Sequence, residues 1–200
     1  TVEYAKRGNK LVKLVRLTAE TLQGIPSIVY GIFGYVFFNV ALYFGFSMLS
    51  GALTLSIMIL PLILRTTEEA LMAVPDSYRE GSFGLGAGKL RTVFRIVLPS
   101  AMPGVLAGVI LAIGRIVGES AALIYTSGSG TGNLSFIKNG AFSLTAPLLQ
   151  STRTLSVHMY ALMSEGLYTD QAHATAVILM VLVIGLNALS SYAAKKLTKQ

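Results

Sequence analysis

Residues 21–64 read TLQGIPSIVYGIFGYVFFNVALYFGFSMLSGALTLSIMILPLIL and contain no aspartate, glutamate, lysine or arginine. A helix that crosses a bilayer needs about 20 predominantly apolar residues. These 44 residues are therefore long enough for two membrane spans joined by a tight turn. A second uncharged run, residues 171–194, has the length of one more span. Because the whole chain is 53% hydrophobic and only 12% charged, an integral membrane protein fits it better than a soluble domain does.

The apolar segments predict one all-α, polytopic membrane domain over residues 1–200. Its four predicted spans cover residues 25–45, 49–64, 101–126 and 172–192. The chain has no cysteine, which excludes disulfides and thiolate metal sites. His158 and His173 are lone histidines without ligand-like spacing, and no catalytic constellation stands out, so we expect neither a metal site nor an enzyme.

Basic residues predict the orientation, because lysine and arginine concentrate in cytoplasmic loops. Segments 1–20 and 65–99 carry five each and the C-terminal tail carries three, whereas the segment 127–171 carries only Lys138 and Arg153. Both ends of the chain and the loop 65–99 are therefore predicted to be cytoplasmic, and the loop 127–171 external. The net charge of +7 then marks cytoplasmic loops and does not indicate nucleic acid as a partner.

The cytoplasmic loop 65–99 contains signals for short helices. Thr66 with Glu69 forms a possible capping box for a helix that runs to Val74, and Ser77 with Glu80 forms a second. Glycines then permit a stop and a sharp turn, at which Gly86 is expected to need a positive φ. A third helix is predicted over residues 89–97. The pattern favours a compact helix–turn–helix that can act as a docking surface, and a solvated connecting loop with incidental caps explains it equally well.

The sequence GLGAGKL, residues 84–90, approaches a phosphate-binding loop but does not form one. Such a loop requires a glycine, four further residues, and then Gly-Lys followed by serine or threonine. Phe83 stands where the first glycine is required, and Leu90 replaces the hydroxyl residue. We therefore expect no nucleotide to bind to this chain.

The same loop resembles the EAA loop of ABC importer permeases, which has the pattern Glu-Ala-Ala, three residues, glycine, nine residues and Ile-x-Leu-Pro. Here Glu80-Gly81-Ser82 is followed at the same spacings by Gly86 and by Ile96-Val97-Leu98-Pro99. Small residues replace both alanines. Longer stretches, residues 24–34, 60–104 and 114–128, are similar to the phosphate-specific permeases, and to their PstA type in particular. The resemblance implies a MetI-like helical bundle, of whose six spans this chain would match the last four and lack the first two.

Several roles follow from the resemblance alone. The EAA loop forms a coupling helix that contacts a groove on the ATPase, which would assign this contact to Glu80, Gly86, Ile96, Leu98 and Pro99. The chain would be one permease of a phosphate importer in the cell (inner or plasma) membrane. Its partners would be a sister permease, two ATPase subunits, an external phosphate-binding protein, phosphate and membrane lipid. ATP would be bound and hydrolysed by the partner, so the chain itself would hold no cofactor.

The third predicted span contains two charged residues, Arg115 and Glu119. On a helix they share a face with Gly104, Gly108, Leu111, Gly118 and Ala122, while branched aliphatic residues cover the opposite face. An arginine inside a bilayer costs at least about 2.5 kcal/mol, which pairing with Glu119 could partly offset. One interpretation is a structural ion pair. The other is an arginine that handles an anion on the translocation path and is held in place by Glu119, since the forked donors of arginine match phosphate oxygens.

Alternative functions remain open from the residues. A permease for another oxyanion, such as molybdate or sulfate, would use the same features. A membrane-embedded enzyme or a proton relay could use Arg115 and Glu119, although a relay needs several titratable groups along one path. In the external loop, residues 126–135 predict flexible coil. Residues 154–166 predict a helix that lies on the membrane surface or dips into the protein.

Overall fold

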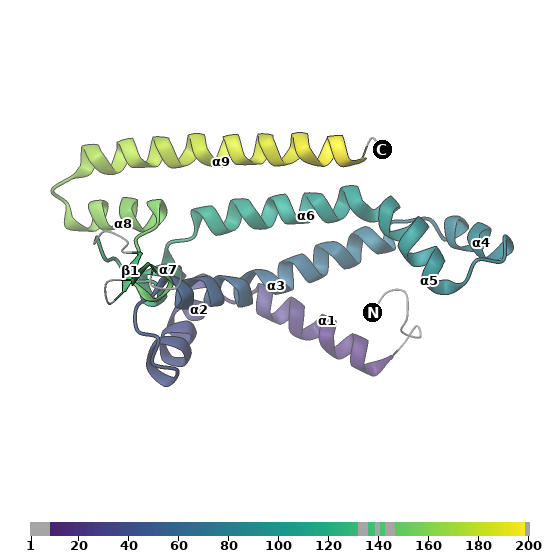
Figure 1. Cartoon of the computed structure of the whole chain (residues 1–200), viewed down its shortest axis with the longest axis horizontal. Helices are drawn as coiled ribbons and strands as arrows, with labels where there is room; N and C mark the ends of the chain where they lie inside the picture. The colour runs from purple at the N-terminus through teal and green to yellow at the C-terminus, as the bar shows by residue number, and fades with distance from the viewer. Residues whose placement is uncertain (1–8, 132–135, 139–140, 143–146, 199–200) are drawn as a thin grey trace. The chain divides into compact units, whose positions relative to one another are not determined.

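A computed structural model describes residues 9–131, 136–138, 141–142 and 147–198 of the chain (Figure 1). The chain divides into two compact units. The first comprises Thr1–Gly24, Leu60–Ile113 and Leu186–Gln200, and the second comprises Ile25–Ile59 and Gly114–Gly185. Three long helices contribute residues to both units.

Within the described ranges, three helices are long and apolar enough to cross a membrane. They are α3 (Met48–Met72), the continuous run Lys89–Gly118, and the Thr169–Tyr192 part of α9 (Thr169–Thr198). The pair α1 (Lys10–Gln23) and Ser27–Ala41 could supply a fourth span, although the two are separated by a break at residues 24–26. Ser27–Ala41 consists of α2 (Ser27–Gly34) and the π-helix η1 (Tyr35–Ala41). This architecture confirms the prediction of an all-α polytopic fold.

The first unit contains the C-terminal part of α3, where the structure differs from the prediction at Thr66. This residue does not cap a new helix, because its hydroxyl donates to the carbonyl oxygens of Leu62 and Ile63 at 3.0 and 3.2 Å inside one unbroken helix. Glu69, the other half of the expected capping box, instead accepts a hydrogen bond from Arg65 Nε at 2.9 Å. Glu69 therefore does not cap a helix start, and the helix continues to Met72.

Three further elements complete the loop of this unit: α4 (Asp76–Gly84), α5 (Lys89–Thr92) and the π-helix η2 (Val93–Val97). The expected cap at Ser77 is wrong, because α4 begins one residue earlier, directly after Pro75, without a side-chain cap. Between α4 and α5 the chain turns at Gly86, whose φ of +79° confirms the expected left-handed conformation. The predicted helix 89–97 is present and runs without a stop at Pro99 into α6 (Leu98–Gly118).

Helices α3 and α6 approach closely at two glycines of α6. A Cβ added to Gly104 would lie 2.7 Å from Ala70 Cβ, and one added to Gly108 would lie 2.7 Å from Thr66 Cβ. A small buried cluster of Val74, Val97 and Ala101 closes the same interface beside the loop. The glycine face predicted for this helix therefore does permit close packing, as small residues do in membrane helix pairs.

In the second unit, α2 and the N-terminal part of α3 pack against α7 (Ala121–Thr126). A Cβ on Gly31 would lie 2.8 Å from Ala122 Cα, and one on Gly51 would lie 2.9 Å from Ser127 Cβ. Asn39, in the π-helix η1, donates from its amide to the carbonyl oxygens of Tyr125 and Thr126 at 3.3 and 3.1 Å. Its side-chain oxygen accepts from the hydroxyl of buried Ser50. The amide thus ties three helical segments together.

The expected single span over residues 101–126 is wrong, because the helix is broken. Helix α6 ends at Gly118, and α7 begins at Ala121 after Glu119 and Ser120. Glycine and serine are weak helix formers, and the backbone groups freed by the break have other partners. Glu119 Oε1 accepts from Ala122 N at 3.1 Å, and Ser156 Oγ donates to Glu119 O at 2.7 Å.

The helix expected in residues 154–166 is present as α8 (Leu155–Glu165). Thr154 caps its start by accepting from Val157 N at 3.3 Å, and Gly166 ends it with a φ of +69°. Its buried residues, Ser156, Val157 and Leu162, face the interior of the second unit. Of the two alternatives, this favours a helix that enters the protein.

The segment that precedes α8 begins with residues 127–131, for which flexible coil was expected. Ser151 Oγ donates to Ser127 O at 2.8 Å and accepts from Gly130 N at 3.3 Å, so this stretch is held by hydrogen bonds. The rest of that expectation, residues 132–135, lies outside the described part of the chain. A minimal antiparallel ladder between β1 (Ile137–Lys138) and β2 (Ala141–Phe142), and a 3-10 turn η3 (Pro147–Leu149), complete the segment.

The close approach at Gly108 gives a first prediction. Gly108→Val should destabilise the protein by about 1–3 kcal/mol, because the added methyl groups would overlap Thr66 in a helix interface that cannot expand freely. The measurement is the thermal unfolding midpoint in detergent. Gly185→Val in α9 is the matched control, since a Cβ there meets nothing within 4 Å. Equal midpoints for the two variants would contradict close packing of α3 on α6.

Candidate functional site

Residues 76–97, which we call the inner loop because the basic residues predict a cytoplasmic position, form a compact helix–turn–helix within the first unit. Ser82 and Thr92, only 4% and 1% exposed, share a hydrogen bond of 2.8 Å between their hydroxyl groups that joins α4 to α5. In the turn, Gly86 N donates to Phe83 O at 2.9 Å and Ala87 N donates to Ser82 O at 3.1 Å. The predicted compact helix–turn–helix is therefore present, and its use as a docking surface stays a prediction.

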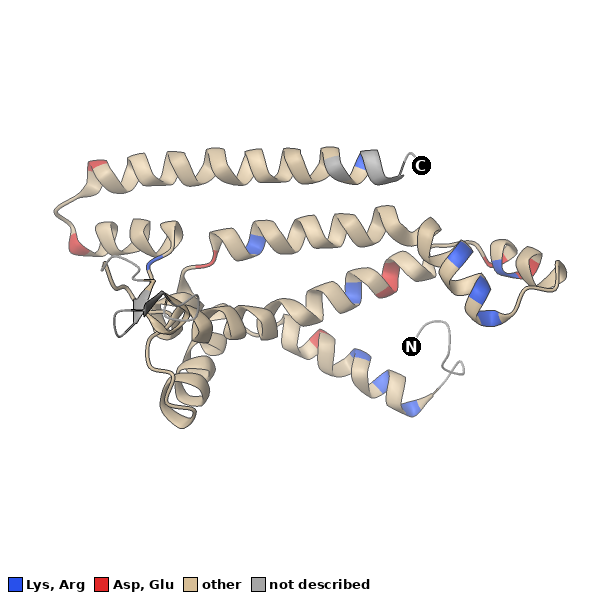
Figure 2. Ribbon diagram, viewed as in Figure 1, with Lys and Arg blue, Asp and Glu red and all other residues tan. Residues whose placement is uncertain are grey.

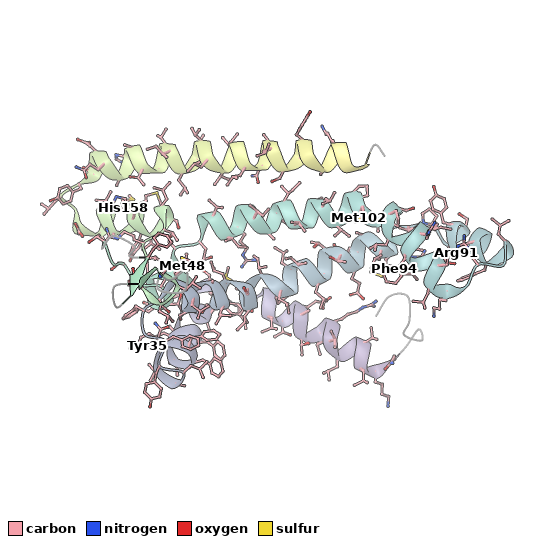
Figure 3. All side chains as sticks on the ribbon, viewed as in Figure 1. Tyr35, Met48, Arg91, Phe94, Met102 and His158 are labelled. Carbon is pink, nitrogen blue, oxygen red and sulfur yellow. The ribbon has the colours of Figure 1, made fainter. Side chains whose placement is uncertain are left out.

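The outer side of the inner loop carries large apolar side chains that nothing in the described part of the chain covers. Leu85 is 90% exposed and Leu90 64%, and three aromatic residues, Tyr78, Phe83 and Phe94, are about half exposed or more. Basic residues lie on the same loop (Figure 2), and the exposed Arg91 is labelled in Figure 3. Large apolar side chains exposed on an otherwise polar loop are typical of an interaction site, and we call these five side chains the loop patch.

The structure places the five predicted coupling residues in two groups. Glu80 is exposed on α4 and Gly86 lies in the exposed turn, so both belong to the outer part of the inner loop. Ile96 and Leu98 are partly buried, and Val97 between them is fully buried against Val74 and Ala101. Pro99 is exposed at the start of α6. Ile96 and Leu98 thus lie at the junction between the inner loop and α6.

The second candidate site is the pair Arg115 and Glu119, in the second unit. The expected ion pair is absent: among the described residues, no carboxylate forms an ion pair with Arg115. Glu119 N donates to Ile116 O at 3.2 Å, which tightens the last turn of α6. The Glu119 carboxylate turns to Ala122 N at the start of α7 instead of to Arg115. Arg115 is exposed, while Glu119 is half-buried.

Sequence reasoning missed two arginines with defined partners. Arg16 of α1 pairs with Glu68 of α3 at 2.9 Å, and the Glu68 side chain is only 9% exposed. Arg79 of α4 donates to backbone carbonyl oxygens of the segment that leads out of α3. For Arg79, the only signal in the sequence was its spacing from Asp76, three residues earlier on the same helix. Within the residues searched, no group of three histidine, cysteine or acidic side chains could hold a metal ion.

Comparison with known proteins identifies relatives over almost the whole chain. The family described as "Binding-protein-dependent transport system inner membrane component" matches residues 3–199. "Probable ABC transporter permease protein YqgI" of Bacillus subtilis (strain 168) is 37% identical over 98% of this chain and 69% of its own length. "Phosphate transport system permease protein PstA" of Mycobacterium leprae (strain TN) is 33% identical over 93% of the chain and 58% of its own.

A third relative is "Phosphate transport system permease protein PstA 2" of Mycobacterium tuberculosis (strain CDC 1551 / Oshkosh). It is 44% identical over 60% of this chain and 40% of its own length. The chain thus spans between 40% and 69% of the length of these three relatives. No solved structure matches the chain.

The turn of the inner loop gives a second prediction. Gly86→Ala should destabilise the turn by about 1 kcal/mol, because a left-handed conformation is unfavourable for any residue with a Cβ. Amide hydrogen exchange at residues 86 and 87 should become about fivefold faster.

Gly88→Ala is the control for this change. Neither glycine has an atom within 4 Å of an added Cβ, but Gly88 has a φ of −71°, which alanine adopts without strain. An equal acceleration in both variants would show that the effect does not arise from backbone conformation.

Proposed function

We propose a function from one premise: the chain belongs to the family of binding-protein-dependent transport system inner membrane components. It is thus a multi-pass membrane component of a transport system. We infer that it is a permease subunit of an ATP-driven phosphate importer. The observation that carries this proposal is the similarity over most of the chain to relatives named as phosphate permeases of the PstA type.

The proposed partners follow from the same family. A cytoplasmic ATPase would bind the inner loop, and an external phosphate-binding protein would deliver phosphate to a path formed with a sister permease. The loop patch supports the first contact, because exposed leucines and aromatic side chains around an exposed Glu80 offer both an apolar anchor and a charge. ATP would bind to the partner, since Phe83 and Leu90 interrupt the only phosphate-loop-like sequence of this chain.

In the proposed mechanism, ATP binding closes the ATPase dimer and displaces the inner loop of each permease. The inner loop is suited to this task because it is internally tied by the Ser82–Thr92 hydrogen bond and joined at its base to the cluster of Val74, Val97 and Ala101. A tied element passes a displacement to the spans, whereas a loose linker would absorb it. Hydrolysis would then reset the spans.

Phosphate uptake by reconstituted vesicles tests this function. Vesicles that hold the complete complex with its ATPase and binding protein should accumulate inorganic phosphate only when ATP is present on the ATPase side. Molybdate and sulfate are the comparison ions, because the same fold could carry another oxyanion. Uptake of one of these ions in place of phosphate would replace the substrate while keeping the transport role. ATP-independent uptake would contradict the importer itself.

The orientation gives a third prediction. The chain lacks cysteine, so a single cysteine can report the side of the membrane on which it lies. A cysteine at Leu85, which is 90% exposed, should react with an impermeant thiol reagent only from the cytoplasmic side. A cysteine at the exposed Ser129 should react only from outside. Labelling of both positions from the same side would contradict the predicted orientation, in which residues 85 and 129 lie on opposite sides of the membrane.

Arg115 gives a fourth prediction, because a phosphate anion that crosses a low-dielectric barrier needs a positive partner. Arg115→Gln should abolish most uptake while the complex still assembles, and Arg115→Lys should restore little if two parallel hydrogen bonds to phosphate matter. Glu119→Gln should retain most uptake, since an amide oxygen can still accept from Ala122 N.

The double variant Arg115→Gln with Glu119→Gln separates the functional role from a structural one. If Arg115 serves the anion, the double variant should remain as inactive as Arg115→Gln. Recovery of uptake in a stably assembled double variant would show instead that the two charges matter only to each other.

A further inference from the structure

The end of α3 needs partners for its last backbone carbonyls, because a helix leaves its final four carbonyl oxygens without intrahelical donors. Arg79, one helix further along the chain, donates to one of these carbonyls and to one in the segment that follows. Its Nη2 donates to Leu71 O at 2.9 Å and its Nη1 donates to Val74 O at 2.7 Å. The Arg79 side chain is only 15% exposed, so these hydrogen bonds are largely shielded from water.

The chemistry of the contact is favourable on two counts. The carbonyl end of a helix carries partial negative charge, which attracts a guanidinium group. Hydrogen bonds from a charged donor are also stronger than those between neutral groups. Asp76 accepts from Arg79 Nη1 at 3.2 Å and helps to orient it, but its carboxylate is 66% exposed, so this ion pair alone contributes little.

Helix α4 is therefore held from two sides within the first unit. Arg79 ties it to the end of α3, and Ser82 ties it to Thr92 of α5. Between α3 and α4 the backbone passes through only residues 73–75, which would act as a hinge if nothing spanned them. The guanidinium group of Arg79 spans this hinge directly.

We propose that Arg79 is a positioning residue for coupling: it locks α4 onto the end of α3, so that a force applied to the inner loop moves the span instead of bending the hinge. This inference rests on the proposed function. Arg79 contacts neither nucleotide nor phosphate in this role. It acts by making α3 and α4 move as one body.

The test is a comparison of Arg79→Gln with the unaltered complex, reconstituted with its ATPase and binding protein. The variant should hydrolyse ATP at a comparable basal rate, while phosphate uptake per ATP falls at least about tenfold. Tenfold is the factor that the loss of one charge-assisted hydrogen bond produces in an equilibrium. Arg79→Lys should recover part of the uptake, because an ammonium group can reach one carbonyl but cannot span both.

Asp76→Asn is the matched control, since it changes an exposed partner of Arg79 and leaves both carbonyl contacts in place. It should couple as the unaltered complex does. Hydrogen exchange in the isolated permease adds a readout that needs no transport. Amides of residues 76–84 should exchange faster in Arg79→Gln than in Asp76→Asn.

The outcomes separate this inference from the function on which it rests. An unaltered complex without ATP-driven phosphate uptake would contradict the proposed function, and faster exchange of α4 in Arg79→Gln would then still support the lock. An active unaltered complex whose Arg79→Gln variant couples normally would overturn the role of Arg79. If Arg79→Gln does not assemble, Arg79→Lys is compared with the unaltered complex instead. Full coupling of phosphate uptake to ATP hydrolysis in Arg79→Lys would then overturn the positioning role, and a partial loss of coupling would support it.

Discussion

A bilayer offers no water to backbone carbonyls and amides, so each interruption of an apolar helix has to be closed from within the protein. In this chain polar side chains perform this task at two breaks in the apolar segments, and one does the same where α3 ends in the predicted cytoplasmic loop. Glu119 and Ser156 bind the backbone at the break between α6 and α7. Asn39 binds the last carbonyls of α7, and Arg79 binds the carbonyls where α3 ends. These polar residues of an otherwise apolar chain are therefore placed where helices stop.

This constraint also explains why glycine and small polar residues lie where helices meet. A side chain can bind the free backbone groups at a break only if the helix that carries it lies close by. Such a close approach is possible at Gly31, Gly51 and Gly108, because these residues have no side chain to separate the helices. The second unit shows both features together, since the hydroxyl that binds Asn39 comes from Ser50, next to Gly51. Close packing and backbone satisfaction are thus two aspects of one arrangement.

The sequence predicted the helical class and the approximate course of the long helices, because an uncharged apolar run of 20 or more residues matches the thickness of a bilayer. It also predicted the turn at Gly86, whose left-handed backbone favours glycine for a steric reason. It failed where two local signals compete. At Thr66 the predicted capping box does not form. Glu69 pairs with Arg65 of the same helix, which continues through Thr66. The break after Gly118 was missed because its partner, Ser156, lies 37 residues beyond Glu119 along the chain. The role of Arg79 depends on backbone carbonyls, which leave no signal in side-chain patterns.

The break after Gly118 changes the interpretation of Arg115. Glu119 has a structural task at this break. Its carboxylate accepts a hydrogen bond from Ala122 N, and its backbone carbonyl accepts one from Ser156 Oγ. A helix-locking ion pair between the two residues is therefore not what retains Arg115 in an apolar helix. Retaining an arginine without a carboxylate partner in a bilayer is costly, and the cost falls only if the guanidinium group meets water, a protein partner or an anion. Arg115 is exposed near the end of α6, where such a group can reach it. The missing pair weighs against the structural interpretation and against a path role in which Glu119 holds Arg115, so a path role for Arg115 stays a prediction that does not depend on Glu119.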